Sequence, residues 1–292
     1  MPAAAAQVLI FYLYMPQKAD LHLHTTASDG RFPPEKLIEK CAAAGLHAIS
    51  ITDHDTTAGY EEALPAAQLA GIELLSGIEI TCEMEGRERH LLAYNFNPGH
   101  PKMKAFIQAQ RRRRYQRGRK MVENLNRLGF DLSLDEVTAE AGTLNISRNH
   151  IAGLMISKGY VAHKQLVFDK YIGDAAPAYH KAEYEDIVAV IQLIHTCGGV
   201  AVLAHPGRHY TQKQLRFLID AGIDGFECIH PSHTFRFQKQ YAGLCETHGL
   251  LKTGGSDFHG FRLHEMSNLG IVAVDMSWVK KLRERTLPAA VS

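Results

Sequence analysis

The sequence has few of the residues that stabilise small secreted proteins. Its 292 residues include only five cysteines, no two of which form a C-x-x-C pair, and a single tryptophan. An odd number of scattered cysteines argues against a disulfide framework and fits a reducing compartment. We therefore expect a cytoplasmic protein in which most cysteines are small apolar side chains of the core.

The sequence also has no large excess of positive or negative charge and no long apolar run. The formal net charge is +1 with histidines neutral, so a nucleic acid or a membrane would have to be recognised by a local patch. The apolar run at 8–14 is too short to span a bilayer and follows no basic segment. We expect no membrane association and no obligate protein partner, and we expect residues 1–15 to be a dispensable extension.

Alternating strands and helices dominate the rest of the chain. Apolar strand patterns are followed by helical patterns that start near proline or a polar cap and stop at glycine. Predicted strands lie at 18–24, 47–55, 72–81, 89–96, 200–207, 223–231, 250–260 and 269–275. Repeated β-α order of this kind predicts an α/β fold with a mostly parallel sheet or barrel.

One long segment interrupts this alternation. Residues 98–180 read as helices only, with patterns at 103–129, 133–142, 147–159 and 163–173. We interpret residues 98–180 as a helical insert domain between two halves of one barrel, 16–97 and 181–292.

Metal-ligand residue types recur at the ends of the predicted strands. The chemistry of these side chains is shared, although they come from separate parts of the chain: His22, His24, Asp29, Asp53, His54, Asp55, Glu79, His90, His205, Glu227, His230, His233, Asp257 and His259. In β/α barrels the carboxyl ends of the strands meet at one mouth. Carboxylates gathered there would repel each other unless cations separate them, so the pattern predicts a metal site.

The segments "DLHLHTTASDG", "ITDHD", "GIEIT", "RHLLAY", "LAHPG" and "GGSDFHG" together resemble the polymerase and histidinol phosphatase (PHP) family. They occur in the family's order and cover residues 18–95 and 183–275. The resemblance implies a distorted seven-stranded, TIM-like β/α barrel whose site holds two or three divalent metals. Imidazole and carboxylate ligands together suit Mn, Fe or Zn.

The resemblance also implies a ligand set for each metal. One metal would be held by His22, His24, Glu79 and Asp257. A second would share Glu79 and add His90 and His205. A third would be held by Asp29, His54 and His259.

The insert resembles the nucleotide phosphatases of this family through "ISRNHIAGLMISKG". The resemblance implies that Arg148 and His150 hold a substrate phosphate, with Ser147 nearby, although Ser147 is equally a helix N-cap. Relatives often carry a basic residue near the end of the insert, where His180 or Lys181 would substitute here. Arg208 is a further candidate phosphate contact, or else a solvated surface residue.

These features predict a hydrolase that releases phosphate from small nucleotides such as 3′,5′-nucleotide bisphosphates. We expect metal-activated hydroxide to attack phosphorus, with Glu79 and Asp257 as catalytic metal ligands. His233, or less favourably His230, would orient phosphate or protonate the leaving oxygen. The alternatives are a 5′-3′ exoribonuclease on short RNA and a non-catalytic metal-binding module.

The run "RRRRYQRGRK" at 111–120 leaves two interpretations open. A solvated helix face is the more common outcome for such a run, whereas a patch that tracks RNA phosphates is the functional one. Salt dependence separates an exoribonuclease from a mononucleotide phosphatase, because the affinity for RNA falls steeply with salt and the affinity for a mononucleotide falls much less.

Overall fold

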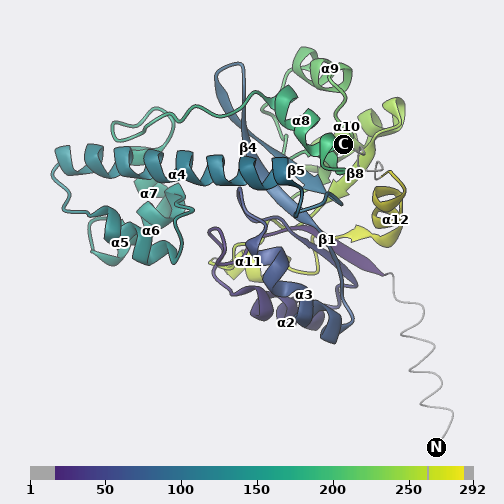
Figure 1. Cartoon of the computed structure of the whole chain (residues 1–292), viewed down its shortest axis with the longest axis horizontal. Coiled ribbons are helices and arrows are strands. Elements are labelled where there is room, and N and C mark those ends of the chain that lie inside the picture. Colours follow the sequence, from purple (N-terminus) through teal and green to yellow (C-terminus); the bar gives the residue numbers. More distant parts are fainter. Residues whose placement is uncertain (1–16, 262, 286–292) are drawn as a thin grey trace, which may run out of the picture.

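The computed structural model describes residues 17–261 and 263–285, so the predicted extension at 1–15 lies outside the described residues. Two sheets form the body of the molecule, and a group of helices projects to one side of them (Figure 1). Within the described part of the chain, no helix is long and apolar enough to cross a membrane.

In the described part of the chain, nine strands form the two sheets. They are β1 (Lys18–Leu23), β2 (Ala48–Ile51), β3 (Glu73–Leu75), β4 (Gly77–Met84), β5 (Arg87–Tyr94), β6 (Val200–Leu203), β7 (Gly225–Ile229), β8 (Leu251–Gly254) and β9 (Val274–Asp275). The strand orders are β3-β2-β1-β9 and β4-β5-β6-β7-β8. Strands β1, β2 and β3 pair in parallel, as do β6, β7 and β8. Strand β9 pairs antiparallel with β1, and β5 pairs antiparallel with both β4 and β6.

The chain therefore has the mixed α/β fold that the sequence predicts, but its strands do not close into one seven-stranded barrel. Among the described residues, two single β-bridges link the sheets. One joins Leu23, at the end of β1, to Phe258, after β8, and the other joins His54, after β2, to Glu79 within β4. A shared apolar cluster joins both sheets, and the Tyr94 hydroxyl donates to the Leu21 carbonyl at 2.8 Å. The sheets thus meet at the strand ends where the polar side chains lie.

Helices cover the outer faces of the sheets. They are α2 (Pro34–Ala43), α3 (Ala58–Ala70), α8 (Ile187–Thr196), α9 (Gln212–Asp220), α10 (Phe235–His248), α11 (Leu263–Asn268) and α12 (Met276–Glu284). Pro34 begins α2, where a missing N–H is harmless, and Gly71 ends α3 with φ of 66°. The expected last strand at 269–275 is shorter than predicted, since only Val274–Asp275 pair with β1.

Only helices occupy the chain between β5 and β6. They are α4 (Pro101–Arg127), α5 (Leu134–Ala141), α6 (Arg148–Ser157), α7 (Lys164–Val167), the π-helix η1 (Phe168–Ile172) and then α8. Met103 and Ile107 in the first half of α4 belong to the apolar cluster that also contains residues of β4, β5 and α8. The second half of α4 belongs to a separate apolar cluster with α5 and α6. The helix α4 thus connects the sheets to the helical group (Figure 1).

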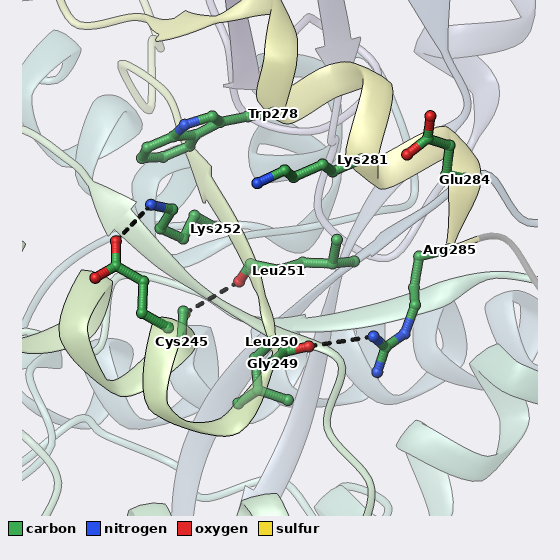
Figure 2. A pocket seen from close by; sticks show the side chains of 10 residues that line it. Cys245, Gly249, Leu250, Leu251, Lys252, Trp278, Lys281, Glu284 and Arg285 are labelled. Carbon is green, nitrogen blue, oxygen red and sulfur yellow. Dashed lines mark hydrogen bonds and ion pairs between the residues drawn. The ribbon is translucent and has the colours of Figure 1, made fainter.

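A cavity of about 490 Å³ opens between α10, β8 and α12 (Figure 2). Lys252 pairs with Glu246 there at 2.9 Å and lies over the ring of Trp278. This cavity adjoins the beginning of β8, whereas the predicted ligands Asp257 and His259 follow its end. It is therefore separate from the site described next.

Candidate metal centre and phosphate site

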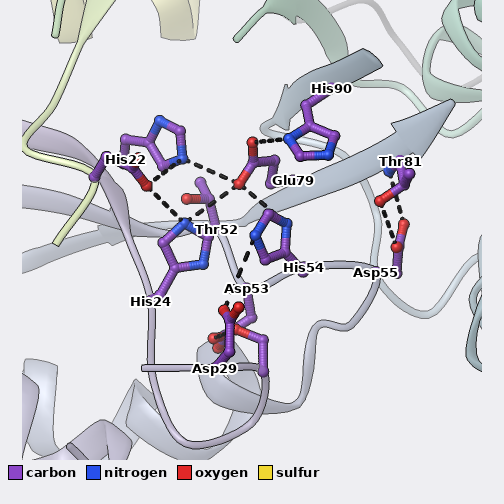
Figure 3. Close-up of polar contacts among 12 residues, drawn as sticks. His22, His24, Asp29, Thr52, Asp53, His54, Asp55, Glu79, Thr81 and His90 are labelled. Carbon is purple, nitrogen blue, oxygen red and sulfur yellow. Dashed lines mark hydrogen bonds and ion pairs between the residues drawn. The ribbon is translucent and has the colours of Figure 1, made fainter. Parts of the chain in front are cut away.

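The site forms where strands of both sheets end. β1 places His22 on the face that His24, just beyond the strand, also occupies, because alternate residues of a strand share a face. His54 follows β2, and Glu79 lies within β4. Figure 3 shows the three imidazoles turned toward the carboxylate of Glu79.

The carboxylate of Glu79 is the centre of this arrangement. Its Oε1 lies 2.8 Å from Nδ1 of His90 and 2.9 Å from Nε2 of His205. Its Oε2 lies 3.2–3.3 Å from three further imidazole nitrogens, those of His22, His24 and His54. One buried carboxylate therefore contacts histidines from five separate positions in the chain.

Asp53 holds the loop that presents Asp29. Its carboxylate accepts hydrogen bonds from the Thr25 backbone N–H at 2.7 Å, the Thr25 hydroxyl at 2.6 Å and the Ser28 hydroxyl at 2.5 Å. Asp29 Oδ1 then lies 3.3 Å from Nε2 of His259. Asp53 is therefore a positioning residue for this part of the site.

Asp257 completes the inner group from the loop after β8. Its Oδ1 lies 3.1 Å from Nε2 of His24 and 3.3 Å from Nε2 of His22. Asp257, His205 and Asp55 have positive φ angles of 50°, 29° and 52°. Such conformations are uncommon for residues with a side chain and concentrate at functional sites.

The electrostatics of the site favour ionised carboxylates beside positive charge. Burial would raise the pKa values of Glu79, Asp29 and Asp257, but the surrounding imidazoles hold all three well below their usual range. Burial would lower the pKa values of His90 and His259, but their carboxylate neighbours raise both to about 10. Positive charge on the imidazoles compensates the carboxylates in this arrangement, and a divalent cation held between the same groups would do the same.

Several buried ligand atoms fit a metal better than a hydrogen-bond network. Nδ1 of His24 has neither a hydrogen bond nor an ion pair among the described residues, whereas Nε2 of His24, Nδ1 of His54, Nδ1 of His90 and Oδ1 of Asp29 face oppositely charged groups at 2.8–3.3 Å without hydrogen-bond geometry. Three groups have ligand atoms within 4.8 Å of one another: His24, Asp29, His54 and His259; His22, His24, Glu79 and Asp257; His54, Glu79 and His90. This mixture of imidazole and carboxylate can hold divalent metal ions.

A cavity of about 190 Å³ lies beside this cluster and is rich in arginine. Its cationic lining comes from Arg114, Arg117 and Arg148, and it also reaches His54 and His90. Guanidinium groups match phosphate oxygens with paired hydrogen bonds. The cavity therefore places three guanidinium groups, together with the carboxylates of Glu88 and Asp29, beside the metal-ligand cluster.

Ser147, Arg148 and His150 lie at the start of α6, next to this cavity. The Ser147 hydroxyl accepts from the Asn149 backbone N–H at 3.1 Å, and Nδ1 of His150 accepts from the Ser147 N–H at 3.1 Å. Ser147 is thus a helix cap and also lines the cavity. Arg148 pairs with Asp174 at 2.7 Å and lies 3.7 Å from Glu88.

The other predicted substrate contacts are more scattered. Lys181 pairs with Glu83 at 3.0 Å outside the small cavity, and Arg208 is exposed. His230 Nε2 lies 3.3 Å from Oδ2 of Asp257, next to the cluster.

Both ring nitrogens of His233 contact backbone. Nε2 accepts from the Gly207 N–H at 3.0 Å, and Nδ1 lies 3.0 Å from the Cys228 carbonyl. In this arrangement neither nitrogen is free to orient phosphate or to protonate a leaving group.

The sequence interpretation did not place four contributors at the metal-ligand cluster. Glu88 lies two residues from His90 in β5, so the two side chains share a strand face. The two-residue spacing alone could have predicted that Glu88 lies at the site. Asn149 donates to Asp29 at 2.7 Å from within the segment that resembles the family. Arg114 and Arg117 were inside the arginine run, but only the packing of α4 distinguishes them from their exposed neighbours.

Clustered imidazoles and carboxylates beside an arginine-lined cavity define the class of metal-dependent phosphoesterases. The PHP domain family model matches residues 20–197, and the chain belongs to this family. Its fold and family are those of metal-dependent phosphoric ester hydrolases.

Similar proteins agree with this assignment. The chain is 37% identical over 250 residues to a 5′-3′ exoribonuclease of Haemophilus influenzae, covering 84% of this chain and 91% of that protein. It is 32% identical over 246 residues to a 3′,5′-nucleoside bisphosphate phosphatase of Chromobacterium violaceum, covering 82% and 86%. A Bifidobacterium adolescentis structure described as a candidate metal-dependent phosphoesterase superposes with a TM-score of 0.85 at 32% identity, covering 94% and 99%.

Proposed function

We propose that the protein hydrolyses phosphate monoesters of small nucleotides, with 3′,5′-nucleotide bisphosphates as the preferred class. The observation that carries this proposal is the contact between the Glu79-centred cluster and the small arginine-lined cavity, which share His54, His90 and Asp29. One phosphate would meet the cluster while a second meets Arg148. The similarity to a nucleoside bisphosphate phosphatase supports this substrate class.

Two or three divalent ions, Mn, Fe or Zn, would occupy the cluster. The proposed ligands are His22, His24, Glu79 and Asp257 for one ion, Glu79, His90 and His205 for the next, and Asp29, His54 and His259 for the third. Bound metals supply a nucleophile at neutral pH and neutralise charge on the phosphoryl oxygens. The nitrogens of His24, His54 and His90 that face carboxylates without hydrogen-bond geometry support this assignment.

The residues of the chain would bind and orient the substrate around these ions. Arg148 would hold a phosphate at the start of α6, where backbone N–H groups also favour an anion. We transfer the phosphate-orienting role from His233 to His230 because Nε2 of His230 faces Asp257 at the cluster, while its Nδ1 is held by Ser232; both nitrogens of His233 face backbone away from the cluster. Ser147, His150, Lys181 and Arg208 stay candidate contacts of lower rank.

The architecture that supports this chemistry is also part of the proposal. The two sheets would act as one distorted barrel mouth, formed by residues 16–97 and 181–292, with 98–180 as the insert. The bridges Leu23–Phe258 and His54–Glu79 support a common mouth. The five free cysteines support a cytoplasmic location.

Phosphate release from metal-reconstituted protein tests the proposal. The substrate panel is a set of 3′,5′-bisphosphate nucleotides, nucleoside monophosphates and short 5′-phosphorylated RNA. We expect the highest kcat/KM on the bisphosphates with added Mn. No turnover on any phosphoester, with metal confirmed bound, would contradict the proposal and leave a non-catalytic metal-binding module.

A 5′-3′ exoribonuclease is the second candidate function. The 37% identity to such an enzyme and the basic face of α4 favour it. A higher kcat/KM on short RNA than on the bisphosphates would select this activity instead.

A further inference from the structure

A basic groove lies outside the site, between α4 and residues 180–183. Its volume is about 610 Å³. Its ionisable lining residues are Arg112, Arg113, Arg117, His180, Lys181 and Glu183. Four permanent cations and one carboxylate line the groove; three of the cations pair with carboxylates outside the lining, and Arg112 has no ion pair among the described residues.

Arg117 connects this groove to the metal-ligand cluster. Its side chain lines both the groove and the small cavity beside the cluster, although only 6% of the residue is exposed. Nη1 lies 3.0 Å from Glu88 Oε2 and donates to the Tyr184 hydroxyl at 3.0 Å. Its Nε and Nη2 atoms are buried and have no hydrogen-bond partner among the described residues. Besides its pair with Glu88, this guanidinium therefore keeps two donor atoms for a further acceptor, such as a phosphate oxygen.

The other cations of the groove can exchange partners with an anion. Arg113 pairs with Glu185 at 2.6 Å and Lys181 pairs with Glu83 at 3.0 Å, but both pairs are partly exposed. Exposed ion pairs of this kind are weak. Arg112 is exposed and has no ion-pair partner in the described ranges.

The groove continues along the outer face of α4 into a second hollow of about 540 Å³. Arg112 and Gln116 line both hollows, and the second adds Arg111, Tyr115 and Leu144. Ten helical residues, 108–117, rise by about 15 Å, which is several times the rise of about 3.4 Å per nucleotide in one strand of a duplex. Cations for the backbone and an aromatic ring for a base are the combination that binds single-stranded nucleic acid.

We propose that this groove binds the backbone phosphates of a single-stranded RNA whose terminal nucleotide lies at the metal-ligand cluster. The proposal rests on the proposed function, because the same site would cleave the bond at the terminal nucleotide: water would add to phosphorus of the first phosphodiester and the P–O3′ bond would break, so the terminal nucleotide leaves with a 3′-hydroxyl and the shortened RNA keeps a 5′-phosphate. Arg117 would contact the first phosphate beyond the cluster, and Arg112 and Lys181 would contact the next. The protein would then act on short RNA as well as on mononucleotides, with the same metal site.

The variant Arg112→Gln tests the groove, and Arg119→Gln is its matched control. Arg119 is exposed on the same helix and lies outside both hollows. The measurement is kcat/KM on a 5′-phosphorylated RNA pentamer, divided by kcat/KM on a 3′,5′-bisphosphate nucleotide. We expect Arg112→Gln to lower this ratio by about threefold to tenfold, and to reduce the slope of log Kd against log salt by about 1. Arg119→Gln should leave the ratio unchanged.

An equal effect of both variants, or an unchanged ratio in Arg112→Gln, would overturn the groove assignment. Binding gives a second measurement that does not depend on turnover. Fluorescence anisotropy of a phosphorothioate RNA pentamer on metal-loaded protein should show weaker binding for Arg112→Gln only. Loss of all hydrolysis together with retained, Arg112-dependent RNA binding would contradict the proposed function but support the groove.

Discussion

Oε1 of Glu227 lies 2.9 Å from Nδ1 of His22 beneath the metal-ligand cluster. A ring that donates Nδ1–H to Glu227 keeps the lone pair of Nε2 for the cluster, where Glu79 lies 3.2 Å away. The second oxygen of Glu227 accepts from the His205 backbone N–H at 2.6 Å. One carboxylate thus positions two proposed ligands.

Replacing Glu227 should therefore weaken metal binding without removing a ligand. We expect Glu227→Gln to lower Mn affinity by about 10–100-fold, because the amide keeps the volume but not the charge that orients His22. Isothermal titration with Mn measures this. Glu246→Gln removes an exposed carboxylate near Lys252 and should bind Mn like the original protein. Equal affinities in the two variants would refute the positioning role.

Glu79→Gln should abolish phosphoesterase activity and reduce the metal content per chain. The carboxylate faces five imidazoles, and an amide cannot bridge cations through two charged oxygens. Elemental analysis after Mn loading, together with phosphate release, measures both effects. The exposed Glu62→Gln variant is the control. Full activity in Glu79→Gln would exclude the bridging role.

Arg148→Ala should mainly weaken substrate binding. Loss of a hydrogen bond to a charged group predicts a KM about 10–100-fold higher, with a smaller change in kcat. Steady-state kinetics on a bisphosphate nucleotide separate the two constants. Arg127→Ala, an exposed residue at the end of α4, should leave KM unchanged. An unchanged KM in Arg148→Ala would count against the phosphate contact.

Arg114→Ala should destabilise the fold. The Arg114 guanidinium donates to Asp55 and to the Thr81 hydroxyl, so it ties α4 to β4 in a buried position. Removing one partner of a buried ion pair lowers the free energy of unfolding by about 3–5 kcal/mol. Urea unfolding measures the loss. Among the described residues Arg119 has one ion pair, with Glu123 on the surface, so Arg119→Ala should change stability by less than about 1 kcal/mol.

Metal removal should lower thermal stability. An ion that binds only the folded state adds about 2.7 kcal/mol when its free concentration is 100 times Kd. We therefore expect Mn to raise Tm and a chelator to reverse the rise in scanning calorimetry. The same experiment on Glu79→Gln should show a much smaller rise, and equal rises would place the stabilising ion elsewhere.

The sequence by itself determined the order of the elements and the chemistry of the strand ends. Periodicity and turn residues are local signals, so the β-α alternation and the helical segment between β5 and β6 could be predicted from them. Metal-ligand residue types at the strand ends, such as His22, His54 and Asp257, could also be recognised from the sequence. Parallel strands bring such ends together, so their convergence followed from topology.

Only the tertiary structure decided which side chains contact one another. The position of Glu79 between five imidazoles depends on how two separate sheets meet, and no local pattern fixes that distance. The packing of α4 on β4 buries Arg114 and Arg117 and leaves Arg111 and Arg112 exposed, although all four belong to one run. The contact of His233 Nε2 with the Gly207 N–H likewise comes from a loop that is distant in sequence. Side-chain chemistry is local information, whereas burial and partner choice depend on contacts between distant segments.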